Sequence, residues 1–150
     1  MTNHTVTHST FSLERTYPVP PEQVFSAWAD AAIKVRWFAK DSEDYELDFR
    51  PGGVEHNRVI HDGKPITWES LYREILADER IVYTSVLYEQ DMVATVSLTT
   101  VEFAPEGEGT HLVLVEAGAF LDERERPEWR EQGTGEWLDA LGKALVNQPG

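Results

Sequence analysis

The sequence contains no cysteine, which excludes disulfides, thiol chemistry and cysteine-ligated metals. It also lacks any apolar run near the ~20 residues that a transmembrane helix needs. The first ten residues, MTNHTVTHST, carry neither the basic segment nor the apolar core of a signal peptide. We therefore expect a cytoplasmic protein that does not insert into a membrane.

Basic residues are scarce, with 13 lysines and arginines against 27 acidic residues and a formal net charge of −14. Such a surface repels phosphate backbones, so nucleic acid is not an expected partner. The chain shows no phosphate-binding loop, no dinucleotide fingerprint and no Ser-His-Asp order. These features predict no cofactor and leave any catalytic residues unknown.

The histidines do not predict a metal site. None of the five forms a His-x-x-x-His pair, which would place two ligands on one helical face. His56 and His61 are an odd number of positions apart, so on one strand they would face opposite sides. We therefore predict no metal.

A chain of 150 residues is the length of one domain and can bury roughly 70% of its unfolded surface. Residues 1–9 are polar and are predicted to be a flexible N-terminal tail. Residues 10–147 show no internal repeat and no linker, which predicts a single domain.

The ordered part begins with a short strand and two short helices. Apolar and polar residues alternate as far as Tyr17, and a proline-rich break follows. Pro21 suits the first turn of a helix, and Val24 and Trp28 recur at helical spacing. Asp30 can cap a second helix over residues 31–37, because its carboxylate can accept from free backbone amides.

The middle of the chain has strand periodicity. Tyr45, Leu47 and Phe49 alternate with acidic residues, and residues 50–53, Arg-Pro-Gly-Gly, are a strong turn signal. Further strand-like runs joined by short polar links continue to about residue 117. This pattern is typical of an antiparallel meander.

The last part of the chain is charged and then helical. Trp129, Gly133, Trp137, Leu141 and Leu145 recur every four residues, which predicts one apolar face on a helix of ~20 residues. This helix is the one long amphipathic element that can cover the inner face of the sheet. The sequence therefore predicts an α+β helix-grip fold, a curved antiparallel sheet wrapped around a long C-terminal helix.

Several stretches together resemble the SRPBCC or START-like superfamily, and more narrowly the homologue-like family of the activator of heat-shock protein ATPase. The stretches are ERTYPVPPEQVFSAWADAAIKVRWF, DFRPGGVEHNRVIHDG, YREILADERIVYTS, GTHLVLVEAGAF and the terminal Trp-Leu helix. The resemblance spans Phe11 to Leu145. It implies a helix-grip fold around an apolar cavity, on a scaffold shared by hydrophobic-ligand carriers, aromatic cyclases and chaperone co-factors.

Candidate ligand-binding residues follow from which strand faces turn toward the terminal helix. Aromatic side chains with polar tips can both line a cavity and orient a ligand. The aromatic candidates are Trp37, Phe49, Trp68, Tyr72, Tyr83 and Trp137.

His56 and Arg58 are the polar candidates, because they share a face with Val54 and Ile60. If that face points inward, the histidine could titrate near neutral pH and the arginine could bind a carboxylate. The alternative is that both side chains reach water.

Two further features leave alternatives open. Glu74 and Glu116 could act as bases if buried, although for Glu74 a salt bridge with an arginine on a neighbouring strand is preferred. Gly133 and Gly135 lie where the terminal helix should run, and either relax its start or leave room above a pocket.

Three functions are compatible with these observations. The first is a module that binds a small hydrophobic or aromatic molecule, whose identity the sequence does not give. The second is a cyclase or dehydratase that uses His56, Arg58 or a buried glutamate. The third is a chaperone co-factor or another protein-interaction module, and the sequence leaves a homodimer open in all three cases.

Overall fold

The computed structural model describes residues 4–146, which form seven strands and three helices. The chain begins with β1 (Val6–Tyr17) and two short helices, α1 (Pro21–Ala29) and α2 (Ala31–Trp37). The remaining elements are β2 (Asp44–Leu47), β3 (Val54–His61), β4 (Lys64–Leu76), β5 (Arg80–Glu89), β6 (Met92–Glu106), β7 (Gly109–Leu121) and α3 (Pro127–Val146).

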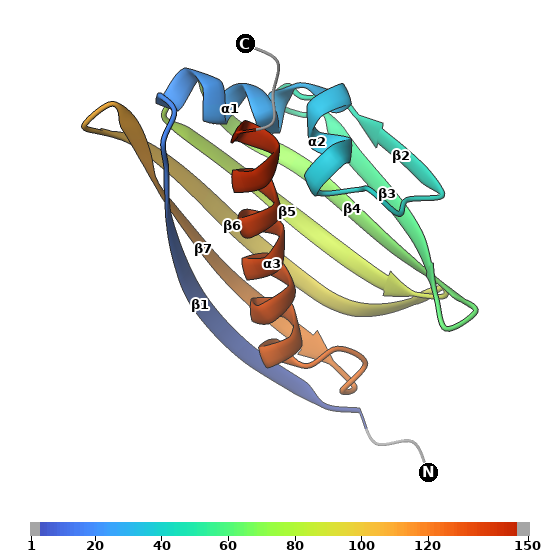
Figure 1. Cartoon of the computed structure of the whole chain (residues 1–150). Coiled ribbons are helices and arrows are strands. Elements are labelled where there is room, and N and C mark those ends of the chain that lie inside the picture. Colours follow the sequence, from blue (N-terminus) through green and yellow to red (C-terminus); the bar gives the residue numbers. More distant parts are fainter. Residues whose placement is uncertain (1–3, 147–150) are drawn as a thin grey trace.

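The strands form one antiparallel sheet in the order β1-β7-β6-β5-β4-β3-β2. From β2 to β7 it is a continuous meander, and β1 closes the far edge against β7. The sheet curves around α3, while α1 and α2 lie at one end of the same face (Figure 1). This arrangement is the predicted α+β helix-grip fold.

Local signals explain where the first helices begin. Pro21 occupies the first turn of α1, where its missing N–H costs no helical hydrogen bond. The Asp30 side chain accepts a hydrogen bond from the Ala32 amide at 2.9 Å, so the predicted cap of α2 is confirmed. Gly52 has a φ of +84°, as the predicted turn before β3 requires.

The predicted N-terminal tail is too long. Val6 to Ser9 belong to β1, and they pair with Leu121 to Gly118 of β7. Their side chains are mostly exposed, so hydrophobic patterning could not reveal a segment that is held by backbone pairing. Residues 1–3 and the predicted domain boundary at Asn147 lie outside the described residues.

A bulge in β4 reverses the side-chain alternation of its last part. Tyr72 pairs with Tyr83 but Glu74 pairs with Val82, so two residues of β4 oppose one of β5. Glu74 is therefore not on the face of Tyr72, and its Oε1 lies 2.6 Å from Nη2 of Arg80 on β5. The preferred salt-bridge interpretation of Glu74 is confirmed.

The core lies between the inner face of the sheet and the three helices. Tyr17 shows how the layers are joined, because its hydroxyl donates to the Leu138 carbonyl of α3 at 2.8 Å. Leu138, Leu141 and Leu145 of α3 are almost completely buried. Within residues 4–146, no helix is both long and apolar enough to cross a membrane.

Candidate functional site

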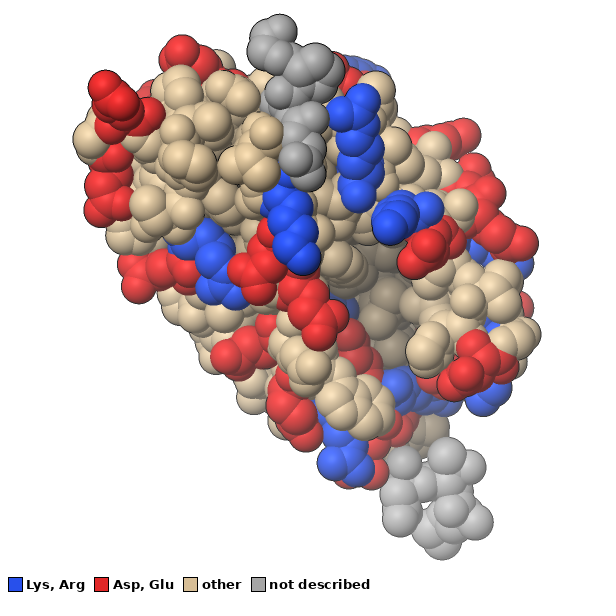
Figure 2. Space-filling model, in the orientation of Figure 1, with Lys and Arg blue, Asp and Glu red and all other residues tan. Residues whose placement is uncertain are grey.

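An open pocket of about 450 Å³ lies between the start of α3, the end of α2 and strands β3 to β5. Its wall is formed mainly by rings and aliphatic side chains with a few polar groups. Figure 2 shows this face of the molecule, hollowed beside α3 and with charged side chains around it. The residues that line the pocket are Trp37, Phe38, Ala39, Lys40, Asp41, Asn57, Val59, Ile66, Trp68, Leu87, Glu125, Trp129, Arg130, Gly133, Thr134 and Trp137.

Three of the predicted ligand-binding residues come together in this pocket. Trp37, Trp68 and Trp137 come from α2, β4 and α3, and all three contribute to its wall. The Trp68 and Trp137 rings meet edge to face, with centroids 5.8 Å apart. This contact helps to fix the orientation of the two indole rings in the pocket wall.

The other three aromatic candidates do not line this pocket. Phe49 is half-buried and packs edge to face on Tyr72, which is itself fully buried. Tyr83 borders a separate void of about 10 Å³ behind Trp137. The curvature of the sheet directs these rings into the core beneath α1 and α2, and strand alternation alone does not reveal that curvature.

His56 and Arg58 lie on the outer face of β3, so the expectation that they face a cavity is wrong. Arg58 is exposed, and the His56 ring nitrogens lie 3.4 Å from carboxylate oxygens of Asp44 and Glu69. The inward positions of β3 are instead Glu55 and Asn57, which are 2% and 7% exposed. Glu55 can point inward because the interior supplies polar partners for its carboxylate.

Asn57 lines the pocket and carries a buried hydrogen-bond acceptor that has no partner. Among buried side-chain nitrogen and oxygen atoms of residues 4–146, only Asn57 Oδ1 and Trp28 Nε1 lack a hydrogen-bond partner. Leaving a buried polar atom unpaired costs on the order of 1–3 kcal/mol. Asn57 lies in the pocket wall but its Oδ1 is itself buried, so a ligand donor would relieve this cost once the amide turned toward the pocket.

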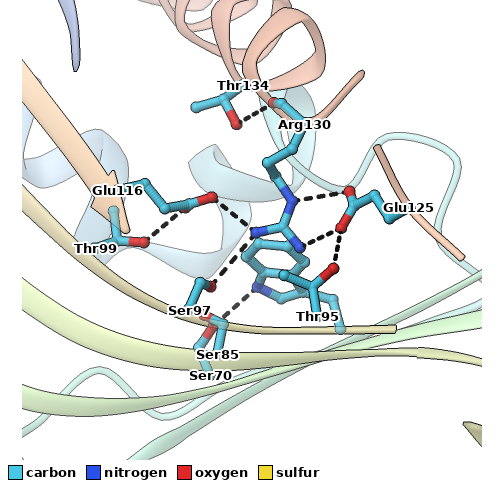
Figure 3. Close-up of polar contacts among 10 residues, drawn as sticks. Ser70, Ser85, Thr95, Ser97, Thr99, Glu116, Glu125, Arg130 and Thr134 are labelled. Atoms are coloured by element: carbon cyan, nitrogen blue, oxygen red, sulfur yellow. Dashed lines mark hydrogen bonds and ion pairs between the residues drawn. The ribbon is translucent and has the colours of Figure 1, made fainter. Parts of the chain in front are cut away.

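Arg130 of α3 joins the pocket to a buried polar cluster on the sheet (Figure 3). Its Nη1 donates to Glu116 Oε2 of β7 at 2.8 Å, and its Nε and Nη2 donate to the two oxygens of Glu125 at 2.9 and 2.8 Å. Thr99 Oγ1 donates to Glu116, and Thr95 Oγ1 donates to Glu125. The question left open for Glu116 is answered, because this carboxylate is an ion-pair partner of Arg130.

The Trp68 ring supports the Arg130 guanidinium. The Arg130 Cζ lies 4.4 Å from the centre of the ring, a favourable cation–π distance. The Trp68 Nε1 donates to Ser70 Oγ at 2.8 Å, and Ser70 and Ser85 hydroxyls are 2.7 Å apart. The pocket floor is therefore held by hydrogen bonds that cross from β4 to β5.

The carboxylates keep Arg130 charged. Burial alone would lower its pKa, but Glu116 and Glu125 outweigh that effect and raise the pKa above its ordinary value. The cluster thus places one permanent positive charge between two carboxylates at the pocket wall.

Lys34 of α2 forms a second buried ion pair that is closed off from the pocket. Its Nζ lies 2.7 Å from Glu55 Oε2 and 4.6 Å from the centre of the Phe38 ring. The Tyr45 and Tyr72 hydroxyls donate to Glu55 at 2.6 and 2.9 Å. Burial lowers the pKa of Lys34, and Glu55 only partly opposes this shift.

Gly133 gives the pocket part of its depth. It lies within α3 and in the pocket wall, and a Cβ added there would find no atom within 4 Å. Gly135 has a different role, because a Cβ there would lie 3.2 Å from the Arg15 guanidinium. Of the two alternatives, room above a pocket therefore applies to Gly133.

The sequence reasoning missed Lys34, Asn57, Glu125 and Arg130. A signal existed for Arg130, because residues 130, 134, 138 and 141 recur at helical spacing and so share the buried face of α3. The predicted face began at Trp129, which is in fact 58% exposed, although its later members Leu141 and Leu145 are buried. Within residues 4–146, no group of three or more His, Asp or Glu side chains could hold a metal ion.

The fold and the pocket together define a helix-grip protein whose cleft lies between the sheet and the terminal helix. The family model described as "Activator of Hsp90 ATPase homolog 1-like protein" matches residues 18–146. The chain belongs to this family, as its sequence resemblance predicts.

Solved structures of similar chains support the assignment. A putative uncharacterized protein from Rhizobium leguminosarum is 36% identical, with a TM-score of 0.94 over 98% of this chain and 100% of its own. The Mll3558 protein from Rhizobium loti is 39% identical, with a TM-score of 0.88 over 93% and 99%. The CV1439 protein from Chromobacterium violaceum is 26% identical, with a TM-score of 0.77 over 93% and 98%. No curated protein matches the chain.

Proposed function

We propose that this protein binds a small, mainly apolar or aromatic molecule in the pocket between α2, α3 and strands β3 to β5. The observation that carries the proposal is the open pocket of about 450 Å³, whose wall includes three tryptophans. The buried, unpaired Asn57 Oδ1 supports it, because a turn of that amide would let a ligand donor satisfy the acceptor. The fold is commonly used for ligand binding, which supports the same conclusion.

The size and composition of the pocket support this function. Its volume of about 450 Å³ falls within the usual range for small-molecule sites, roughly 300–1,000 Å³. Such sites combine apolar walls with a few polar groups that orient the ligand. Here Trp37, Trp68 and Trp137 provide the wall, and Asn57 and Glu125 provide the polar groups.

The residues that were named for a catalytic function are not free to act in the pocket. His56 and Arg58 lie on the outer face of the sheet. The buried Glu55 and Glu116 are both held in ion pairs, with Lys34 and Arg130 respectively. Binding therefore accounts for the pocket better than proton transfer by these groups.

Native mass spectrometry of freshly purified protein, compared with its denatured mass, tests the proposal. We expect an adduct that the variant Gly133→Leu loses, because the new side chain would occupy the pocket. The matched control is Glu131→Leu, an exposed position on the same helix, which should keep the adduct. An adduct that survives Gly133→Leu would place the ligand elsewhere. Absence of any adduct, together with no binding of the probes described below, would reject the proposal.

A further inference from the structure

The charges around the pocket are unequal. The buried cluster at its wall holds one guanidinium, Arg130, between two carboxylates, Glu116 and Glu125. The Arg130 and Glu116 side chains are only 3% and 4% exposed, and Glu125 is 16% exposed, so water screens them weakly. At the rim, Lys40 and Asp41 are both exposed and carry opposite charges. The charges that line the pocket itself are balanced, and the one negative charge in excess belongs to Glu116, which lies behind the wall as the second partner of Arg130.

Arg130 is not available to bind an anion. Its Nε and Nη2 donate to Glu125, and its Nη1 donates to Glu116 and, at 3.4 Å, to Ser97. An incoming carboxylate would have to displace one of these acceptors and would meet the other at close range. The arginine in this wall thus does not mark a site for an acid.

The groups that are available in the pocket accept hydrogen bonds or attract cations. Asn57 Oδ1 has no partner, and the side chain is more than nine-tenths buried. Glu125 also lines the pocket, and its Oε2 accepts one bond, from Arg130. Indole faces attract positive charge, and Trp68 already contacts one cation in this way.

We propose that the pocket selects a ligand whose aromatic or aliphatic ring carries a protonated amine. This inference rests on the proposed binding function and names its ligand class. The ring packs among Trp37, Trp68 and Trp137, while the ammonium lies near the Glu125 carboxylate, and a turn of the Asn57 amide presents Oδ1 to it as an acceptor. The overall charge of −14 adds a long-range attraction for cations.

Three probes of one shape and different charge test the selection. They are 2-(1-naphthyl)ethylamine, 2-(1-naphthyl)ethanol and 1-naphthylacetate, titrated into the full chain by isothermal calorimetry at pH 7. We expect the amine to bind about tenfold more tightly than the alcohol, because the hydrogen bond becomes charge-assisted. The carboxylate should bind most weakly.

Variants separate the contributing groups. Asn57→Leu should weaken amine binding about tenfold, because it removes the free acceptor with little change in volume. At the exposed rim, Asp41→Asn should weaken the amine by about two- to threefold and Lys40→Gln should strengthen it by a similar factor. Because both rim residues are exposed, this pair remains a test if Asn57→Leu fails to fold.

The outcomes separate the proposed charge selection from the proposed binding function. If the alcohol or the carboxylate binds as tightly as the amine, the charge selection is wrong and the binding function stands. If no probe binds and the purified protein carries no adduct, both proposals fail. An amine preference that both rim variants leave unchanged would also overturn the electrostatic argument.

Discussion

The molecule contains two buried cations, and their surroundings differ in one decisive respect. Lys34 is enclosed, faces one carboxylate and lies near four aromatic rings. Arg130 reaches the wall of an open pocket and faces two carboxylates. The Lys34–Glu55 pair has balanced charges and is enclosed, so it stabilises the fold. The cluster around Arg130 has one carboxylate in excess and borders an open pocket, so it can influence a ligand there. The same chemical groups therefore stabilise the fold in one place and, under the proposed binding function, contribute to recognition in the other.

Breaking the closed pair should have the largest effect. Lys34→Met leaves the Glu55 carboxylate buried without a counter-charge, so we expect a loss of about 3–5 kcal/mol in the free energy of unfolding. Urea unfolding measures this loss. Adding Glu55→Gln should restore most of it, since glutamine can still accept from the Tyr45 and Tyr72 hydroxyls. If the double variant is as unstable as the single one, the ion pair is not the cause.

Breaking the cluster around Arg130 should reduce the free energy of unfolding by less than breaking the Lys34–Glu55 pair. It should also change the affinity for the naphthyl probes. For Arg130→Met we expect a loss of about 2–3 kcal/mol in the free energy of unfolding, because Glu125 is partly exposed and can be hydrated. Arg130→Lys is the matched control, which keeps the charge but loses the two parallel bonds to Glu125. Naphthylethylamine affinity should change more in Arg130→Met than in this control, and it should stay constant in Lys34→Met. An equal change of affinity in Arg130→Met and Lys34→Met would contradict the comparison.

Tyr72→Phe should change how the free energy of unfolding depends on pH. This effect should be smaller than that of the two ion-pair variants. Burial, assisted by Glu55, raises the pKa of Tyr72 far above its ordinary value of 10. Above pH 10 the unfolded chain releases this proton and the folded protein keeps it. Tyr72 thus makes stability fall by about 1.4 kcal/mol per pH unit as pH rises.

Urea unfolding between pH 9 and 11 measures this slope. Removal of the hydroxyl should make the alkaline decline shallower by the same amount, although the variant starts lower because it has lost a bond to Glu55. Parallel slopes for wild type and Tyr72→Phe would show that the hydroxyl does not remain protonated in the folded state.

The sequence predicts the order of the elements well, because local signals set it. Pro21, Asp30 and Gly52 each mark a boundary through backbone geometry or capping. Local signals fail where the structure departs from regular alternation. The bulge between Tyr72 and Glu74 reverses the faces at the end of β4, and no residue type there announces it.

The candidate site is harder to predict, because its contacts join distant parts of the chain. Trp37, Trp68 and Trp137 could be found from their apolar character and their positions on helix or strand faces. Asn57 and Arg130 could not be chosen in the same way, since polar residues are usually assigned to the surface. Arg130 is buried only because the side chains of Glu116 and Glu125 reach it from β7 and from the segment before α3.

The glycine at position 133 has an evolutionary consequence. Gly133 lines the pocket, and a Cβ added there would have no atom within 4 Å, so this residue can be replaced without repacking the core. Alanine there would even favour the helix, by up to about 1 kcal/mol. Under the proposed binding function, related chains that differ at this one residue would keep the same architecture and admit ligands of different size.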